Sequence, residues 1–283
     1  MAHANALRHP PPVIVPGIGT AAIRRPAPGA KPLTLVLGAL PQEIELVDGA
    51  LESVRHGKEG PFPWKSGRVS GRRVVTAVTG IGKTNATMVT ALMVSRFRPG
   101  EVLMTGTASR INPALRNGDV IVGQTTCNHD FGSLAEGYAM EYFGAEGPLG
   151  DAMSILYPGA PGLLAAARRA IKCHVPEHAG QHDPAYIPAV RLGRITSGDQ
   201  FGIPQARIEA ILRQLKPDLM EMESGSVAQV CWYFRTPFLC IRGGSNRTQN
   251  SPDNDYRTLS PFAARQAALF TLSLLAELAK TRR

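Results

Sequence analysis

Two glutamates that flank a methionine, Glu221-Met222-Glu223, stand directly before a predicted helix at residues 224–234. Carboxylates favour the positive end of a helix dipole, so one role open to the pair is to cap this helix. A second role is to bind a sugar, because one carboxylate can accept hydrogen bonds from both hydroxyls of a ribose. The thioether of Met222 would then lie against the sugar ring. The expected place of the pair, at the mouth of a sheet, favours the sugar-binding role.

A glycine-rich segment at residues 241–246 ends the last predicted strand and closes with Asn246. Glycine lets the backbone approach a flat ligand closely. The Asn246 side chain both donates and accepts hydrogen bonds, which suits the edge of a heterocyclic base. For this segment taken alone, an ordinary Gly-Asn turn is the alternative.

Residues 79–84, Thr-Gly-Ile-Gly-Lys-Thr, resemble the end of a phosphate-binding P-loop. The full pattern requires a glycine where this chain has Ala77, and Asn85 fills the last place of the dinucleotide-binding pattern. We therefore expect a tight strand-to-helix turn here rather than a nucleoside triphosphate site.

Apolar strands alternate with helices after about residue 32. A continuous apolar run such as residues 33–37 is typical of a strand buried on both faces. This alternation predicts a single α/β domain at residues 32–283, in which helices cover both faces of a mostly parallel or mixed twisted sheet. The predicted strands are residues 33–37, 73–78, 101–105, 119–125, 190–196, 219–222 and 238–242. The predicted helices are residues 42–54, 83–96, 162–173, 204–215, 224–234 and 261–280.

Two segments fit no regular element. Residues 1–31 are rich in proline, alanine and glycine, which predicts a flexible basic arm. Residues 127–161 are polar and glycine-rich without a clear period, which predicts a functional loop region. In parallel sheets ligands bind at the carboxyl ends of the strands, so the segments that follow each strand are where chemistry is expected.

The composition excludes several classes of protein. Of the 283 residues 43% are hydrophobic and 19% are charged, which favours a packed core over disorder. The longest apolar candidate, residues 267–279, carries Glu277, so we expect no membrane span. The N-terminus lacks the apolar core of a secretion signal, so we expect a cytoplasmic protein. The cysteines form no C-x-x-C pair, and prolines and a glycine interrupt the histidines at residues 174, 178 and 182, so we expect no metal site.

The formal net charge of +9 is concentrated at the two ends of the chain. Before Glu43 there is no acidic residue, and +4 comes from Arg8, Arg24, Arg25 and Lys31. Another +3 comes from Lys280, Arg282 and Arg283, which leaves +2 for the body. Solvated basic ends account for this pattern better than a nucleic-acid surface does, so we expect no specific nucleic-acid binding.

Together these segments resemble the purine nucleoside phosphorylase superfamily, and most closely its 5′-methylthioadenosine/S-adenosylhomocysteine nucleosidase branch. The resemblance runs over most of the chain after about residue 33 and depends on the order and spacing of many short motifs. The matching segments are residues 38–43, 80–83, 105–108, 117–120, 129–130, 197–201, 221–223, 227–231 and 237–238.

The resemblance implies a hydrolytic enzyme that acts on a small purine nucleoside without a cofactor, in a homo-oligomer. Glu43 would activate the attacking water, Glu223 would bind the 2′ and 3′ hydroxyls, and Met222 would lie under the sugar. Cleavage passes through an oxocarbenium-like state, so hydroxyl contacts that strengthen as positive charge builds lower the barrier. Phe201 would stack on the base, and further substrate contacts are implied for Glu221, Thr107, Ala108 and Ser245.

Asn246 departs from the nucleosidase pattern, which has an aspartate at this place. An amide has no proton to give to N7 of the leaving base, and general-acid catalysis typically contributes about 10²–10⁴ in rate. Asn246 resembles instead the superfamily members that handle 6-oxopurines, futalosine hydrolases among them, where its NH₂ group can donate to N7 or O6. A catalytically weak nucleoside-binding protein is a further alternative.

Arg110 is the second departure, because nucleosidases usually have glycine there. Its guanidinium could hold an anion, either phosphate or a phosphorylated substrate. Against phosphorolysis, Met104 fills the place where bacterial hexameric phosphorylases carry a phosphate-binding arginine. Glu43 would also repel phosphate, whereas it suits water. We therefore expect hydrolysis, with phosphorolysis as the alternative.

Overall fold

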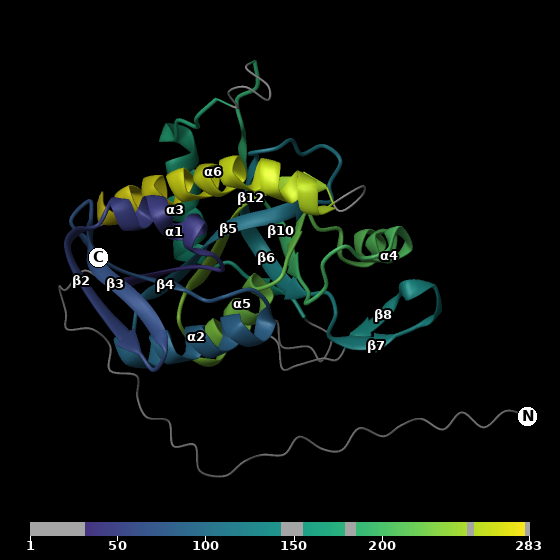
Figure 1. Cartoon of the computed structure of the whole chain (residues 1–283), viewed down its shortest axis with the longest axis horizontal. Coiled ribbons are helices and arrows are strands. Elements are labelled where there is room, and N and C mark those ends of the chain that lie inside the picture. The colour runs from purple at the N-terminus through teal and green to yellow at the C-terminus, as the bar shows by residue number, and fades with distance from the viewer. Residues whose placement is uncertain (1–31, 143–154, 179–184, 248–251, 281–283) are drawn as a thin grey trace, which may run out of the picture.

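The computed structural model describes residues 32–142, 155–178, 185–247 and 252–280. In Figure 1 a central sheet lies between two layers of helices. This arrangement confirms the predicted α/β class. The arm predicted at residues 1–31 lies outside the described residues.

The described elements alternate along the chain much as the sequence predicts. The helices are α1 (Pro41–Gly49), α2 (Lys83–Phe97), α3 (Pro161–Cys173), α4 (Gln205–Leu215), α5 (Ser224–Tyr233) and α6 (Pro252–Lys280), with a short 3-10 helix, η1 (Glu136–Tyr138). The longer strands are β1 (Thr34–Gly38), β2 (Glu52–Glu59), β3 (Phe62–Val69), β4 (Arg72–Val78), β5 (Glu101–Arg110), β6 (Val120–Asn128), β10 (Val190–Ser197) and β12 (Phe238–Arg247). The short strands are β7 (Gly132–Leu134), β8 (Met140–Tyr142), β9 (Tyr157–Pro158) and β11 (Leu219–Glu221).

The main sheet has the strand order β11-β10-β6-β12-β5-β1-β4-β3-β2. Parallel pairing of β4, β1, β5 and β12 brings the carboxyl ends of these strands to one edge. An additional antiparallel pairing joins β11 to the end of β5, where Met220 lies opposite Ser109. This pairing closes β5, β12, β6, β10 and β11 into a ring, a feature that the alternation of elements does not predict.

Two apolar cores flank the sheet. α2 and α5 cover one face, where Leu35 and Leu37 of β1 are buried. The intervening Val36 belongs to the core on the other face, beneath α1, α3 and α6. Successive side chains of a strand point to opposite faces, so a strand covered on both sides must be apolar throughout. This packing explains the continuous apolar run at residues 33–37.

The hairpin of β2 and β3 corrects the sequence prediction, which extended the first helix to residue 54. α1 ends at Gly49, and residues 52–59 turn into a strand that pairs antiparallel with β3. Most side chains of β2 are exposed, because this strand is the outer edge of the sheet. An exposed edge strand has no buried face, so it shows no alternation of apolar and polar residues that would reveal it.

Three further elements differ from the prediction in extent. β5 and β12 continue to Arg110 and Arg247, each five residues beyond the predicted end, because they pair with each other and the end of β5 also pairs with β11. α6 begins at Pro252, so Pro261 lies inside the helix rather than at its start. In the predicted loop at residues 127–161, β7 and β8 form a small separate sheet.

α6 is the one helix in the described ranges with the length and hydropathy of a membrane span, over Tyr256–Lys280. Half of its apolar window is buried inside the protein. Ala267, Phe270 and Leu274 belong to the core beneath α1 and α3. The core helix of a soluble protein meets the same criteria, and the packing of α6 is of that kind.

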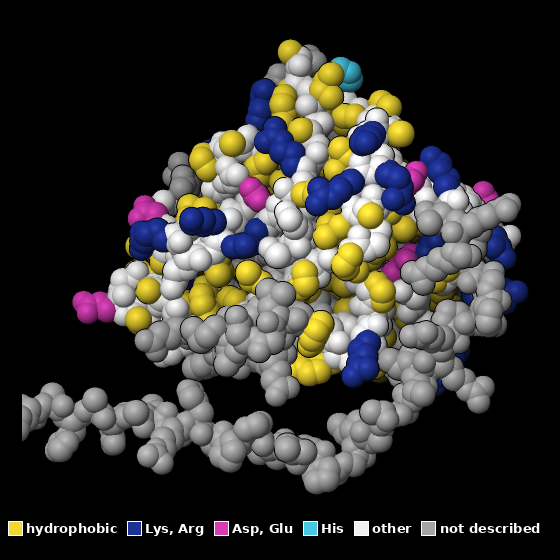
Figure 2. All heavy atoms as spheres, turned by 180° about the vertical axis from the view of Figure 1, so that it is seen from behind, with side chains coloured by type: hydrophobic (Ala, Val, Ile, Leu, Met, Phe, Trp, Pro, Cys, Tyr) yellow, Lys and Arg dark blue, Asp and Glu magenta, His cyan; other side chains and the backbone are white. Residues whose placement is uncertain are grey.

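Basic side chains are dispersed over the face drawn in Figure 2. Lys and Arg groups there alternate with hydrophobic and uncharged atoms, and acidic groups lie among them. This dispersion accords with the small net charge of the body of the chain.

Candidate functional site

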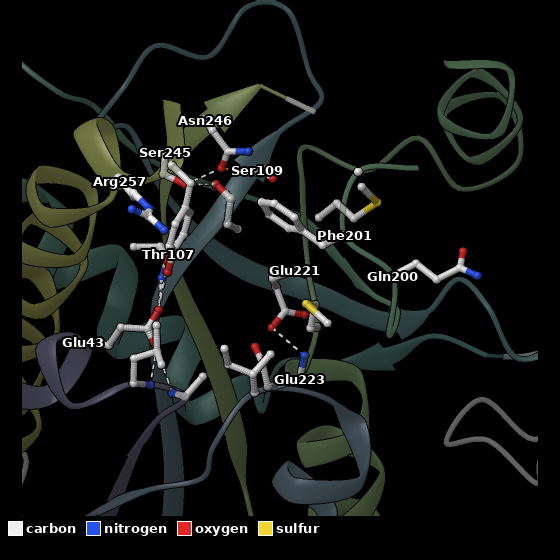
Figure 3. Close-up of a pocket in the computed structure, with 18 residues that line it drawn as sticks. Glu43, Thr107, Ser109, Gln200, Phe201, Glu221, Glu223, Ser245, Asn246 and Arg257 are labelled. Atoms are coloured by element: carbon white, nitrogen blue, oxygen red, sulfur yellow. Dashed lines mark hydrogen bonds between the residues drawn. The ribbon is translucent and has the colours of Figure 1, made fainter. Parts of the chain in front are cut away.

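A cavity of about 480 Å³ opens at the carboxyl ends of the strands. This volume suits a small organic ligand. Its walls come from the segments that follow β1, β4 and β10 and from the ends of β5, β11 and β12 (Figure 3). The location agrees with the expectation that the chemistry gathers where parallel strands end.

Glu43, in the first turn of α1, is held on both carboxylate oxygens. Its Oε2 accepts hydrogen bonds from the backbone N–H groups of Ala39 and Leu40, at 2.8 Å and 3.1 Å. Its Oε1 accepts from the N–H of Thr107 at 2.7 Å and from the Thr107 hydroxyl at 3.0 Å. The side chain is buried, with 2% exposed. The carboxylate of Glu43 therefore has a fixed position at the cavity wall.

Glu221 and Glu223 share a buried cation, Arg242 of β12. The Arg242 guanidinium forms a hydrogen-bonded ion pair with Glu221 and contacts Oε2 of Glu223 at 3.1 Å. Its Nη1 lies 3.7 Å from Oε1 of Glu43. Arg242 is fully buried, so its charge acts on all three carboxylates with little screening by water.

The two glutamates of this pair have opposite pKa shifts. Burial, and next the negative charge of Glu221, raise the pKa of Glu223 to about 8, although Arg242 opposes the shift. Burial would also raise the pKa of Glu221, but Arg242 and the hydroxyl of Ser197 together lower it below its usual range. The lowered pKa of Glu221 favours its ionised form, whereas Glu223 holds a proton more tightly than an ordinary carboxyl does.

Asn246 lies at the opposite end of the cavity from Glu223 (Figure 3). Its Oδ1 accepts hydrogen bonds from the hydroxyls of Ser109 at 3.2 Å and Ser245 at 3.0 Å. Its Nδ2 lies 3.4 Å from the carbonyl oxygen of Arg247. With the amide oxygen occupied, the NH₂ group is the part of Asn246 that can bind a ligand.

Aromatic and apolar side chains complete the walls. Phe201 is half exposed and meets the ring of Tyr256 edge to face, with centroids 6.2 Å apart. Met222 lies between the two glutamates, and Ile81 follows β4. A flat ligand would thus contact Phe201 while its polar groups reach the carboxylates.

Nine of the ten residues predicted for the site line the cavity, namely Glu43, Thr107, Ala108, Phe201, Glu221, Met222, Glu223, Ser245 and Asn246. Arg110 is not among the lining residues. Its Nε donates to the carbonyl oxygen of Ser245 at 2.7 Å, and its Nη1 lies 3.4 Å from that of Leu115. The Arg110 guanidinium thus supports the backbone next to Asn246.

The glycine-rich turn at residues 79–84 has the structural role that the sequence indicates. Gly80 and Gly82 have positive φ angles of 81° and 94°, which favour glycine. The Gly82 N–H donates to Oε1 of Glu223 at 2.9 Å. This turn therefore leads from β4 into α2 and also holds one of the cavity carboxylates.

Sequence reasoning missed Ser109, Arg242, Tyr256 and Arg257. Arg242 stands two residues before Gly244 in the glycine-rich segment, and its burial depends on carboxylates from α1 and β11. Tyr256 and Arg257 enter the cavity wall because α6 starts before Pro261. Proline is common in the first turn of a helix, so Pro261 was predicted as the helix start and the preceding helical residues were missed.

Comparisons with known proteins agree with this fold and this cavity. The family model described as Phosphorylase superfamily matches residues 34–279. A 5′-methylthioadenosine/S-adenosylhomocysteine nucleosidase of Lysinibacillus sphaericus is 30% identical over 245 residues, covering 86% of this chain and 98% of that protein.

Solved structures give the same result. The nucleosidase of the same name from Neisseria meningitidis, in complex with methylthio-immucillin-A, is 30% identical with a TM-score of 0.73, covering 86% of this chain and 98% of that one. A futalosine hydrolase of Helicobacter pylori, 24% identical over 87% of this chain and 97% of that one, has the same fold with a TM-score of 0.73. The family model covers most of the chain, and the protein therefore belongs to the Phosphorylase superfamily.

Proposed function

We propose that this protein is a purine nucleosidase, which uses water to cleave the N-glycosidic bond of a 5′-substituted purine nucleoside. The main observation in favour of this proposal is a pair of carboxylates, Glu43 and Glu223, which face one cavity from different elements. Both lie within ion-pair distance of the Arg242 guanidinium. The relatives named as 5′-methylthioadenosine/S-adenosylhomocysteine nucleosidases support the reaction class.

Glu43 is our candidate for the general base. Four hydrogen bonds fix its carboxylate at the cavity wall, so a water beside it would be held in one orientation. In the reaction the bond between the base and C1′ breaks first, and positive charge develops on the sugar. The electron pair of this bond leaves with the base, which takes up a proton from solvent water. Glu43 then takes a proton from the water as its oxygen bonds to C1′.

Glu223 is our candidate for the group that binds the 2′ and 3′ hydroxyls. A hydroxyl that donates to a carboxylate gains strength as the sugar becomes positive, so this contact favours the transition state over the substrate. Met222 would lie under the sugar ring and Phe201 against the base. The position of Glu223 and Asn246 at opposite ends of the cavity (Figure 3) supports this division into a sugar end and a base end.

Water is favoured over phosphate as the co-substrate. A phosphate in contact with Glu43 would need a cation at that carboxylate, and the cation 3.7 Å from it, Arg242, already pairs with Glu221 and Glu223. Met104 is buried and places its sulfur 3.4 Å from Nη2 of Arg242. The Arg110 guanidinium is directed at backbone carbonyls rather than at the cavity.

The test is to measure release of free base from methylthioadenosine, adenosylhomocysteine, inosine and futalosine, with and without phosphate. We expect base and a free sugar from at least one substrate without phosphate. Phosphate-dependent turnover that yields a sugar 1-phosphate would indicate a phosphorylase instead. Purine binding without turnover of any substrate would indicate a binding protein.

A second candidate, hydrolysis of a 6-oxopurine nucleoside, is favoured by the Ser109–Asn246 hydrogen bond. Both O6 and N7 of a 6-oxopurine accept hydrogen bonds, and the NH₂ group of Asn246 donates. The N6 group of adenine also donates, so it would meet another donor at this place.

We expect Asn246→Asp to lower the ratio of kcat/KM for inosine over adenosine by about tenfold or more, because a carboxyl can accept from N6. Ser109→Ala should lower this ratio less, because Ser245 still holds the amide oxygen. A ratio that is unchanged in both variants would contradict selection of the base by Asn246.

We further propose a homodimer. Exposed apolar side chains lie on α2 and in the segment around β7, which an ion pair between Lys83 and Asp130 joins. These side chains are Ile81, Met88, Leu92, Phe131 and Leu134. A surface of this kind is typical of a protein interface. Light scattering that gives the mass of one chain at micromolar concentration would contradict the dimer.

A cytoplasmic location is likewise our proposal. Its support is that the four cysteines form no disulfide, and that Cys127, Cys231 and Cys240 are buried as free thiols. Free buried thiols are usual in a reducing compartment. Fractionation of cells that express the tagged protein tests this location.

A further inference from the structure

The wall of the cavity carries one cation and three carboxylates. Among the lining residues that the structure describes, Arg257 is the only lysine, arginine or histidine, beside Glu43, Glu221 and Glu223. Arg257 lies on α6 and is exposed to solvent. None of the carboxylates in the described part of the chain forms an ion pair with it, so its guanidinium is available to a ligand.

Neighbouring contacts place Arg257 on the Glu43 side of the cavity. The preceding residue, Tyr256, hydrogen-bonds through its hydroxyl with the side chain of Thr107, which itself donates to Glu43. Figure 3 shows Arg257 on the Glu43 side of the cavity, across from Phe201 and Gln200. The guanidinium therefore lies across the cavity from Phe201, the side chain proposed to stack on the base (Figure 3).

The 5′ substituent is the one part of the nucleoside that the proposed contacts leave unassigned. Asn246 and Phe201 are proposed to bind the base, and Glu223 is proposed to bind the 2′ and 3′ hydroxyls. The lining side chains that remain include Arg257 as their one charged group, beside the neutral side chains of Ala39, Leu40, Ile81, Gln200, Met220 and Tyr256. They suit a substituent with an apolar part and a charged end.

We propose that Arg257 is a specificity-determining residue that binds an anionic group on the 5′ substituent of the nucleoside. A guanidinium presents two parallel N–H groups, which match the oxygens of a carboxylate or a phosphate. Without this cation, an anion in the cavity would meet only the repulsion of Glu43 and Glu221. The inference rests on the proposed function, since it assigns the remaining part of the substrate of the same site.

The experiment compares nucleosides that share one base and differ at the 5′ position. The neutral members carry a hydroxyl or a methylthio group, and the anionic members carry a carboxymethylthio group or a phosphate. The quantity measured is the ratio of kcat/KM for an anionic nucleoside over its neutral counterpart, in the parent protein and in Arg257→Gln and Arg257→Glu. Arg213→Gln, at an exposed position of α4 outside the cavity wall, is the matched control.

We expect Arg257→Gln to lower this ratio about tenfold and Arg257→Glu to lower it further, because a hydrogen-bonded ion pair is replaced first by a neutral contact and then by repulsion. Arg213→Gln should leave the ratio unchanged. Whichever anionic nucleoside responds more strongly identifies the preferred group as carboxylate or phosphate. An equal ratio in the parent protein and Arg257→Gln would overturn the inference.

Failure of the proposed function is distinguishable from failure of this inference. If no nucleoside is cleaved, calorimetry with the same neutral and anionic nucleosides still measures whether Arg257→Gln weakens binding of the anionic one selectively. The effect on the anionic nucleoside should also shrink between 50 mM and 500 mM salt, because Arg257 is exposed. A selective loss supports the role of Arg257, and equal dissociation constants in both proteins contradict it.

Discussion

Arg242 lies behind the cavity wall, where its guanidinium contacts Glu221 and Glu223 and approaches Glu43. Burial, and next the negative charge of Glu221, raise the pKa of Glu223 to about 8, although Arg242 opposes the shift. At the scale of single residues, the site therefore differentiates side chains of the same type. Glu43 is held by four donors at the wall, whereas Glu223 holds a proton more tightly than an ordinary carboxyl does.

Replacing Glu43 by glutamine tests the proposed base directly. We expect Glu43→Gln to lower kcat by about 10²–10⁴, because an amide cannot take a proton from water. Binding of the free purine base should persist, since Asn246 and Phe201 are unaltered. Measurements of base release and calorimetry with the free base give the two values.

Glu45→Gln is the matched control for this substitution, because Glu45 is an exposed glutamate in the same helix. It should keep the parent rate. Turnover by Glu43→Gln at the parent rate would show that another group activates the water. A thermal melt of each variant checks that α1 remains folded.

At the scale of elements, the contact between β12 and α6 leaves no space for a side chain at Gly243. A Cβ added there would overlap the backbone carbonyl oxygen of Ala263 in α6. Backbone cannot move aside as a flexible side chain does. The glycine-rich segment thus serves the packing of α6 as well as the approach of a ligand.

We expect Gly243→Ala to lower the free energy of unfolding by about 1–3 kcal/mol or more, because α6 must shift away from β12. The control adds the same methyl group at Gly49, where nothing lies within 4 Å of the added Cβ. Gly49→Ala should be neutral or stabilise by up to about 1 kcal/mol, since alanine favours the helix. Urea unfolding measures both changes, and equal stabilities of the two variants would contradict the close packing of α6.

At the scale of the whole molecule, the raised pKa of Glu223 links folding to pH. The folded protein binds this proton more tightly than the unfolded chain, whose carboxyl has the usual pKa of about 4.3. The resulting stabilisation is fully present below that value and is lost as pH rises through about 8. Ionisation of Glu223 therefore makes the protein less stable in this range.

Glu223→Gln removes the ionisation and should remove this dependence. We expect the variant to gain stability relative to the parent protein as pH rises from 5 to 8. The measurement is the difference in free energy of unfolding between the two proteins, at several pH values across that window. A difference that does not vary with pH would show that the pKa of Glu223 is not raised.

Much of the architecture follows from local pattern in the sequence. A strand that is buried on both faces can be recognised from a continuous apolar run, such as residues 33–37. The predicted ends of the strands then place Glu43, Glu223 and Asn246 at one edge of the sheet. The edge strand β2, at residues 52–59, escaped prediction because an exposed edge has no such pattern. The start of α6 was also missed, because the sequence offered Pro261 as a plausible first turn.

The sequence by itself determined which side chains stand at the ends of the strands and so which chemistry the cavity can hold. Only the tertiary structure decided their states. The proton on Glu223 depends on burial and on the distances to Glu221 and Arg242, and the orientation of Asn246 depends on Ser109, which is 137 residues away in the chain. Periodicity reports which face of an element is buried, whereas electrostatics depends on separations that arise only when distant segments pack together.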